Sequence, residues 1–185
     1  LKSSLTINTD FAETEVDDRQ INLTRFSLHY PEKRDFFLDG ASHFKFGIDA
    51  DDTSPVSKSI IPFFSRRMGL DSLGGPIPIN VGAKLTGEVD KWNIGMMYIN
   101  DARENGINNF SVARVTRNLG KQSSVGIIGT YGNALGKETN LVVGADLNLS
   151  TSTFQKNKNA SFLLFGLKSN TKELEGNDVS WGTQV

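Results

Sequence analysis

The chain contains no cysteine and only two histidines, which excludes several kinds of chemistry. Without cysteine there is neither a disulfide framework nor a thiolate metal site. His29 and His43 do not form a His-x-x-x-His or similar metal-binding pair. The sequence also lacks a Gly-x-Ser-x-Gly elbow and a phosphate-binding glycine loop. We therefore expect no cofactor and favour a segment without catalytic activity of its own, although a carboxylate pair for glycoside hydrolysis stays open because its spacing depends on the fold.

An excess of charge of one sign and long apolar runs are also missing. Lys and Arg total 20 against 21 for Asp and Glu, a net charge of -1, which argues against a broad nucleic-acid-binding surface. No apolar run approaches the roughly 18 residues of a membrane-spanning helix. Mean hydropathy is -0.30, a value typical of soluble proteins. A transmembrane β-barrel can share that value, because only every second residue faces lipid.

A period-two alternation of apolar and polar residues is what the sequence does contain. It is clear from Ile79 to Thr86 and again from Leu141 to Ser150, and it predicts strands with one apolar and one polar face. Three further strands are expected between them, at 92–99, 110–117 and 125–131. Each is about long enough to cross a bilayer when tilted, for which roughly 9–11 residues are needed. We predict an all-β fold of antiparallel strands and hairpins, part of an outer-membrane-type β-barrel.

The connections between these strands alternate in length, as they do in outer-membrane barrels. Tight turns are expected at 90–91 and 118–121, and longer links at 101–109, 132–138 and 151–159. Aromatic residues that could form interfacial girdles fall near the strand ends, at Trp92, Tyr98, Phe110, Tyr131 and Phe162. The stretch 110–117 does not alternate cleanly, which weakens the membrane interpretation.

Two alternatives to a membrane barrel stay open. One is a soluble all-β module that binds glycans or accompanies a glycoside hydrolase, in which the same alternation faces a core. The other is a structural surface protein that docks partners through its strand edges. Exposure separates the barrel from the soluble module. In a barrel the apolar strand residues should be exposed, and in a soluble module they should be buried; the residues concerned are Ile79, Val81, Leu85, Leu141, Val143 and Leu147.

The chain divides into two parts of one barrel domain. Residues 1–76 are expected to supply N-terminal strands, at 1–9 and 20–30, with charged and aromatic loop segments. Residues 77–185 are expected to form consecutive β-hairpins. The acidic stretch 10–18 could hold a calcium ion, although its spacing does not fit an EF-hand and a solvated loop explains it as well.

Two segments combine charge with aromatic residues, Pro31–Gly40 and Ile60–Leu70. The arginine pair of the second segment could bind a carboxylate, a phosphate or a sugar, because guanidinium offers a planar fork of donors. The alternative, which we favour, is that the arginines pair with acidic side chains inside a polar lumen. We predict a charge network at the barrel mouth or lumen made of Glu32, Arg34, Asp39, Arg66 and Arg67.

Several of these motifs together resemble a family of Gram-negative envelope proteins. The resemblance rests on Asn8-Thr9-Asp10-Phe11-Ala12, Val16-Asp17-Asp18, Gln20 to Phe26, Pro31 to Gly40, Phe63 to Gly69 and Ala83 to Gly87. It departs at Asp35, where the family pattern has a proline. Members of this family pair a module similar to family-nine carbohydrate-binding domains with a domain of unknown function that resembles an outer-membrane barrel.

The resemblance covers about residues 1–149 and implies a location and partners. It implies the bacterial outer membrane, with secreted or periplasmic as the alternative. Outer-membrane lipid, the remaining strands of a longer chain and carbohydrate would be partners, and nucleic acid would not. The chain begins at Leu1 without an initiator Met, which we interpret as a processed or excised piece of something longer.

Overall fold

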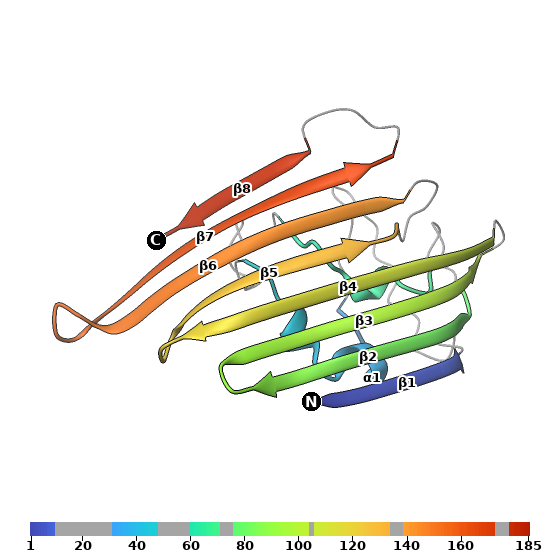
Figure 1. The fold of residues 1–185 in the computed structure, drawn as a ribbon, viewed down its shortest axis with the longest axis horizontal. Coiled ribbons are helices and arrows are strands. Elements are labelled where there is room, and N and C mark those ends of the chain that lie inside the picture. The colour runs from blue at the N-terminus through green and yellow to red at the C-terminus, as the bar shows by residue number, and fades with distance from the viewer. Residues whose placement is uncertain (10–30, 48–59, 71–75, 104–105, 134–138, 173–177) are drawn as a thin grey trace.

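The computed structural model describes residues 1–9, 31–47, 60–70, 76–103, 106–133, 139–172 and 178–185. Within these ranges the fold is a single antiparallel sheet of eight strands in chain order (Figure 1). The strands are β1 (Lys2–Thr9), β2 (Ile79–Val89), β3 (Trp92–Arg103), β4 (Gly106–Leu119), β5 (Ser123–Tyr131), β6 (Asn140–Phe154), β7 (Lys158–Thr171) and β8 (Val179–Gln184). The predicted all-β, antiparallel fold class is confirmed. The sheet is open, with β1 and β8 at its two ends, so these strands alone do not close a barrel.

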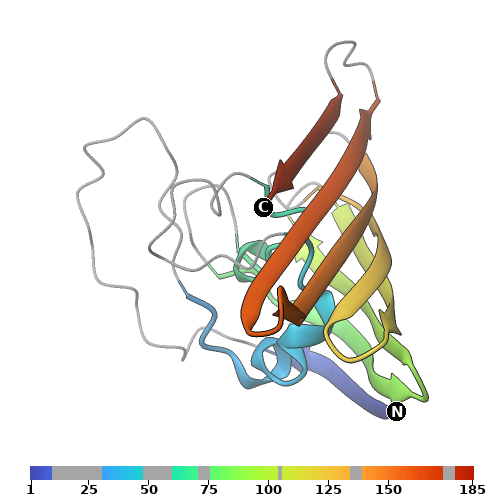
Figure 2. The same cartoon turned by 90° about the vertical axis from the view of Figure 1, so that its left-hand side faces the viewer.

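The sheet is curved, and short helical turns lie on its concave side (Figure 2). They are α1 (Asp35–Leu38), η1 (Ala41–Phe44) and η2 (Ser65–Arg67). Among the described residues, no helix has the length and apolar character needed to cross a membrane. The predicted strand at 20–30 and the acidic stretch 10–18 fall outside the described residues.

Two of the predicted links are strands instead. Asp101 and Asn108 pair directly across β3 and β4, so the polar stretch 101–109 is mostly ladder and only residues 104–105 separate the two strands. The predicted linker 151–159 is also wrong, because β6 continues to Phe154 and β7 begins at Lys158. Both stretches are polar, and polarity alone does not prevent pairing when each backbone group has a partner across the hairpin. The tight turn at 90–91 is confirmed, because β2 ends at Val89 and β3 begins at Trp92.

Successive side chains alternate between a convex outward face and a concave inward face. Residues that pair directly across strands share a face, as Val115, Ile127 and Ala145 do on the outward one. Two of the residues expected to be exposed, Leu141 and Val143, are exposed on the outward face, the latter by 54%. Val81, Leu85 and Leu147, on the same face, are half-buried.

Ile79 contradicts that expectation, because it is 0% exposed. The ladder between β2 and β3 shifts register between Ile79 and Val81. This bulge places Ile79 opposite the buried Asp101, on the inward face. A one-residue shift moves a strand residue to the other face of a sheet, which simple alternation cannot foresee.

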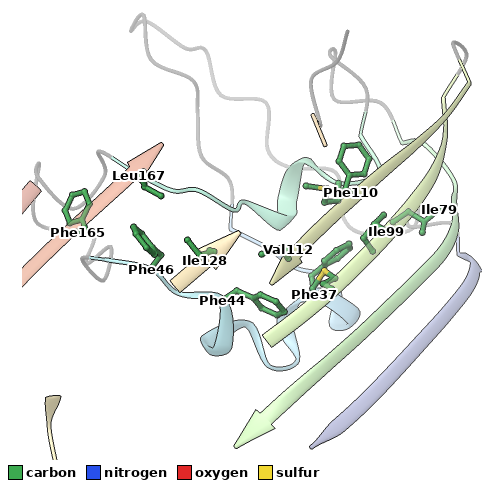
Figure 3. Packing of buried hydrophobic residues seen from close by; sticks show 12 residues of the cluster. Phe37, Phe44, Phe46, Ile79, Ile99, Phe110, Val112, Ile128, Phe165 and Leu167 are labelled. Carbon is green, nitrogen blue, oxygen red and sulfur yellow. The ribbon is translucent and has the colours of Figure 1, made fainter. Parts of the chain in front are cut away.

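The irregular stretch 110–117 also has a structural explanation. Phe110, Val112 and Arg114 all point inward and are buried, while the residues between them point outward. The alternation is therefore intact, and it looked broken because a charged residue occupies an inward position. Phe110 belongs to the buried core rather than to an interfacial girdle (Figure 3).

The core lies between the inward face of the sheet and the segments on its concave side (Figure 3). We call residues 31–47 and 60–70 the inner layer. It contributes Phe37, Phe44, Phe46 and Met68 to a cluster whose other members come from the strands. An edge-to-face ring contact joins the two sides, between Phe46 and Phe165 at a centroid distance of 6.2 Å.

Candidate functional site

Buried charged residues concentrate at the contact between the inner layer and the sheet. The predicted charge-network residues all lie in the inner layer, and the structure distributes them over several places. The first is around Arg34, whose side chain is 2% exposed. Its Nε donates to Glu32 Oε1 at 2.8 Å and its Nη2 to Glu32 Oε2 at 2.8 Å, a bidentate ion pair.

Arg34 also joins the two segments of the inner layer. It donates to the backbone carbonyls of Met68 at 2.6 Å and Ser65 at 2.7 Å. Its guanidinium stacks over the ring of Phe37 at 4.1 Å. The Glu32 carboxylate accepts a further hydrogen bond from Ser65 Oγ at 2.7 Å. The charge of Arg34 is thus neutralised locally, and the cluster fixes η2 against α1.

The surroundings of Glu32 favour its ionised form. Burial acts to raise the pKa of Glu32, but the hydrogen bond and charge of Arg34, with the hydrogen bond from Ser65, outweigh burial and leave the pKa below its ordinary value. The ion pair therefore persists at neutral pH.

The second charged contact links the inner layer to β1 and β2 around Asp39. Lys84, on the inward face of β2, donates to the backbone carbonyls of Phe36 and Asp39. Its Nζ lies 3.4 Å from Asp39 Oδ2, and Lys2 Nζ lies 3.0 Å from Asp39 Oδ1. The hydrogen bond from Lys2 lowers the pKa of the exposed Asp39 carboxyl; a little burial opposes this and Lys84 adds to it. Lys84 thus caps the last carbonyls of α1.

The third charged contact, between two strands of the sheet, was not identified from the sequence. Arg114 on β4 is 3% exposed, and its two Nη atoms donate to the Asp146 carboxylate on β6 at 2.6 and 2.7 Å. Arg114 Nε also donates to the carbonyl of Lys45 at 3.0 Å, and Asp146 accepts from the backbone N–H of Gly47 at 3.2 Å. The inner layer is thereby bonded to the middle of the sheet. Arg114 is two residues after Val112 and therefore lies on the same face of β4. A charged residue at that position was the sequence signal that could have revealed this contact.

Glycines on the inward face make room for these contacts. A Cβ added at Gly126 would lie 2.6 Å from Arg114 Nη1, and one at Gly82 would lie 3.2 Å from the ring of Phe36. At Gly95 it would lie 3.0 Å from the Cβ of His43, and at Gly144 it would lie 3.0 Å from the ring of Phe46. The absence of side chains at Gly82, Gly95 and Gly144 lets the inner layer approach the sheet, and at Gly126 it leaves room for Arg114.

Arg66 and Arg67 occupy different environments although they are adjacent. Arg66 is buried. Arg67 is half-buried and lines a pocket of about 180 Å³ between residues 61–68 and the inward side of β3 to β6. The structure therefore brings Glu32 and Arg34 together, places Asp39 with Lys2 and Lys84, and puts Arg67 beside a cavity.

The charged contacts among the described residues are suited to anchoring the inner layer to the sheet. Each of three buried cations, Arg34, Lys84 and Arg114, faces a carboxylate and backbone carbonyls. In the described ranges no three histidine, aspartate or glutamate side chains gather in a way that could hold a metal ion. The acidic stretch 10–18, considered for calcium, lies outside those ranges.

Comparison with known proteins gives one match. Residues 4–74 match a family described as a domain of unknown function, DUF5916. The match includes β1 and the inner layer and ends before β2. No curated protein matches the chain, and no solved structure does.

Proposed function

We propose that this chain forms part of the wall of an outer-membrane β-barrel, with the inner layer inside the lumen. One observation carries the proposal: the outward face of the sheet is largely apolar and is uncovered by the described residues. From β1 to β8 it presents Leu5, Ile7, Met96, Tyr98, Val125, Ile127, Leu141, Val143, Leu164 and Trp181, all exposed. The largest apolar patch on a soluble monomer is typically only about 300–600 Å².

The distribution of charge supports the same function. On the outward face the basic and acidic residues of the strands are few: Arg117 lies next to the β4–β5 turn, Lys158 lies next to the β6–β7 turn, and Lys168 lies on β7 near its other end. The inward face carries Lys84, Asp101, Arg114 and Asp146. Charge toward the interior and apolar side chains outward is the reverse of a soluble sandwich and the expected arrangement of a membrane barrel.

The open sheet needs closure in such a location. Unpaired strand edges in hydrocarbon leave backbone groups without partners, at several kcal/mol each. We propose that strands from the remainder of a longer chain pair with the β1 and β8 edges. The barrel would serve solute passage or the handling of surface carbohydrate, a role supported by the resemblance to envelope proteins, with no catalysis in this segment.

The absence of cysteine makes a direct test possible, because one introduced thiol is the only one in the chain. Val143→Cys places it on the outward face and Gln122→Cys in the turn between β4 and β5, at an exposed position. In isolated outer membranes we expect a water-soluble maleimide to label Gln122→Cys and to label Val143→Cys only after denaturation. Equal labelling of both in the native state would overturn the lipid-facing assignment.

Membrane fractionation of the full-length protein complements the labelling. We expect recovery in the outer-membrane fraction and a folded band that shifts on heating before gel electrophoresis. A protein found in the soluble fraction without that shift would favour the alternative, a soluble glycan-binding module.

A further inference from the structure

We propose that the pocket beside Arg67 binds a small organic anion, a carboxylate carried on a body the size of one six-membered ring. The pocket lies where η2 leaves the inward face of the sheet uncovered, between residues 61–68 and the ends of β3 to β6 away from the tight turns. This site is distinct from the three charged contacts of the inner layer. It does not depend on the location of the protein in a membrane.

The size of the pocket sets the size of the ligand. Its volume is about 180 Å³. A buried cavity of about 150 Å³ accommodates a benzene molecule. A single ring with one substituent therefore fills the space, whereas a chain of several rings would have to extend outside it.

The charge of the pocket lining determines the sign of the charge that the ligand carries. Arg67 is the one charged residue among the described residues that line the pocket, and none of them is acidic. The neighbouring cations are compensated elsewhere, because Arg34 pairs with Glu32 and Arg114 with Asp146. A half-buried guanidinium next to a concave surface without a carboxylate favours an anion, and its planar fork matches a carboxylate in two hydrogen bonds.

The rest of the lining fits a ring that has both apolar and polar atoms. Phe64 and Val142 provide apolar surface. Thr130, which pairs with Val142 on the inward face, and Asn140 add hydroxyl and amide groups that can donate to or accept from substituents of a ring. Pockets that combine apolar walls with a few polar groups are typical of small-molecule sites.

Titration calorimetry on the detergent-solubilised full-length protein tests the proposal. The probes are benzoate and glucuronate, with benzyl alcohol and methyl glucoside as their uncharged counterparts and inorganic phosphate as a free anion. We expect one or both carboxylates to bind and the uncharged counterparts to bind at least tenfold more weakly. Preference between benzoate and glucuronate reports whether the apolar or the polar lining dominates. Phosphate binding as tightly as either carboxylate would overturn the requirement for a ring.

Two variants assign the binding to this pocket. Arg67→Gln should weaken carboxylate binding about tenfold or more, because a charge-assisted pair is lost. Asn140→Asp, which adds a negative charge to the lining, should weaken it as well. Arg117→Gln, which removes an exposed arginine on the outward face, is the matched control and should leave binding unchanged.

Two results would overturn the proposal. One is unchanged carboxylate binding in Arg67→Gln. The other is that neither carboxylate binds the unmodified protein at about 10 mM, a concentration at which even a weak ligand would bind. Folding of both variants is checked by circular dichroism, so that loss of structure is not mistaken for loss of the site. A failure of the membrane assignment would leave this result interpretable, since the titration requires only folded protein.

Discussion

The two faces of the sheet differ in the polarity of their side chains and in what covers them. The outward face is a largely apolar surface without a covering element among the described residues, and the inward face carries Lys84, Arg114 and Asp146 under a covering layer. Every strand contributes to both faces, so composition cannot explain the difference. What differs is the environment that each face requires. The inward face needs hydrogen-bonding partners, which the inner layer supplies, and in the proposed function the outward face contacts lipid.

The comparison shows how charge can be buried without instability. Three buried cations, Arg34, Lys84 and Arg114, each contact both a carboxylate and backbone carbonyls of the inner layer. A buried ion pair is often no more stabilising than an apolar pair of the same shape, but breaking one is costly. We therefore interpret these pairs as fixing the position of the inner layer, and the predictions below compare the two faces in decreasing order of effect.

The largest effect is expected at the buried pair on the inward face. Asp146→Asn leaves the guanidinium of Arg114 buried without its counter-charge and should lower the free energy of unfolding by about 3–5 kcal/mol. Urea titration followed by tryptophan fluorescence measures it. Asp178→Asn is the control, because Asp178 and Lys168 form an exposed pair at 3.9 Å that should contribute at most about 1 kcal/mol. Equal losses in the two variants would contradict the anchoring role of Arg114.

The outward face should respond to charge according to depth. Ile127, 60% exposed, lies in the middle of β5, and Ile127→Arg should cost about 2–4 kcal/mol if that position faces the centre of a bilayer. Leu119→Arg, at the end of β4, should cost only about 0–1 kcal/mol because charge is tolerated near the interface. Unfolding in phosphatidylcholine vesicles compares the two. If the face were in water, both changes should stay within about 0.5 kcal/mol.

Two glycines of β5, one on each face of the sheet, allow the effect of one added methyl group to be compared between the faces. Gly126→Ala should cost about 1–3 kcal/mol, since the new Cβ would lie 2.6 Å from Arg114 Nη1, which the bond to Asp146 holds in place. Gly129→Ala, on the outward face, would meet nothing within 4 Å and should change stability by less than about 0.5 kcal/mol. The same urea titration distinguishes them. A Gly129 variant as unstable as the Gly126 variant would show that backbone effects outweigh the fit of the inner layer.

The smallest effect is expected from acid at the Glu32–Arg34 pair. Because the pKa of Glu32 is lower in the folded state than in the unfolded state, its contribution to stability is complete above the ordinary value of 4.5 and is lost as the pH falls through the folded-state pKa. Glu32→Gln should remove this pH dependence and lower stability at neutral pH on the order of 1–2 kcal/mol. Glu88→Gln, at the exposed end of β2, controls for loss of one carboxylate. An unchanged acid transition in Glu32→Gln would assign it to another group.

Much of the fold could be predicted because it depends on local pattern. Alternation from Ile79 to Thr86 and from Leu141 to Ser150 predicted strands that are present, and with them an all-β chain. The polar stretches 101–109 and 151–159 misled because they were judged by composition, whereas backbone pairing across a hairpin depends on the partner strand. The sequence could not place the bulge near Ile79, because an extra residue in one strand is defined only against its neighbour.

The candidate site shows the same limit. Charged and aromatic density distinguished residues 31–40 and 60–70 in the sequence, and these segments form much of the inner layer. Which carboxylate each cation meets was decided by the tertiary structure: Arg114 and Asp146 are 32 positions apart, on strands that are not neighbours, and only the curvature of the sheet and the bare Gly126 between them bring them together. Alternation determined that two unlike faces would exist. The packing of the inner layer decided which face it covers, because buried charge needs partners that only distant segments can supply.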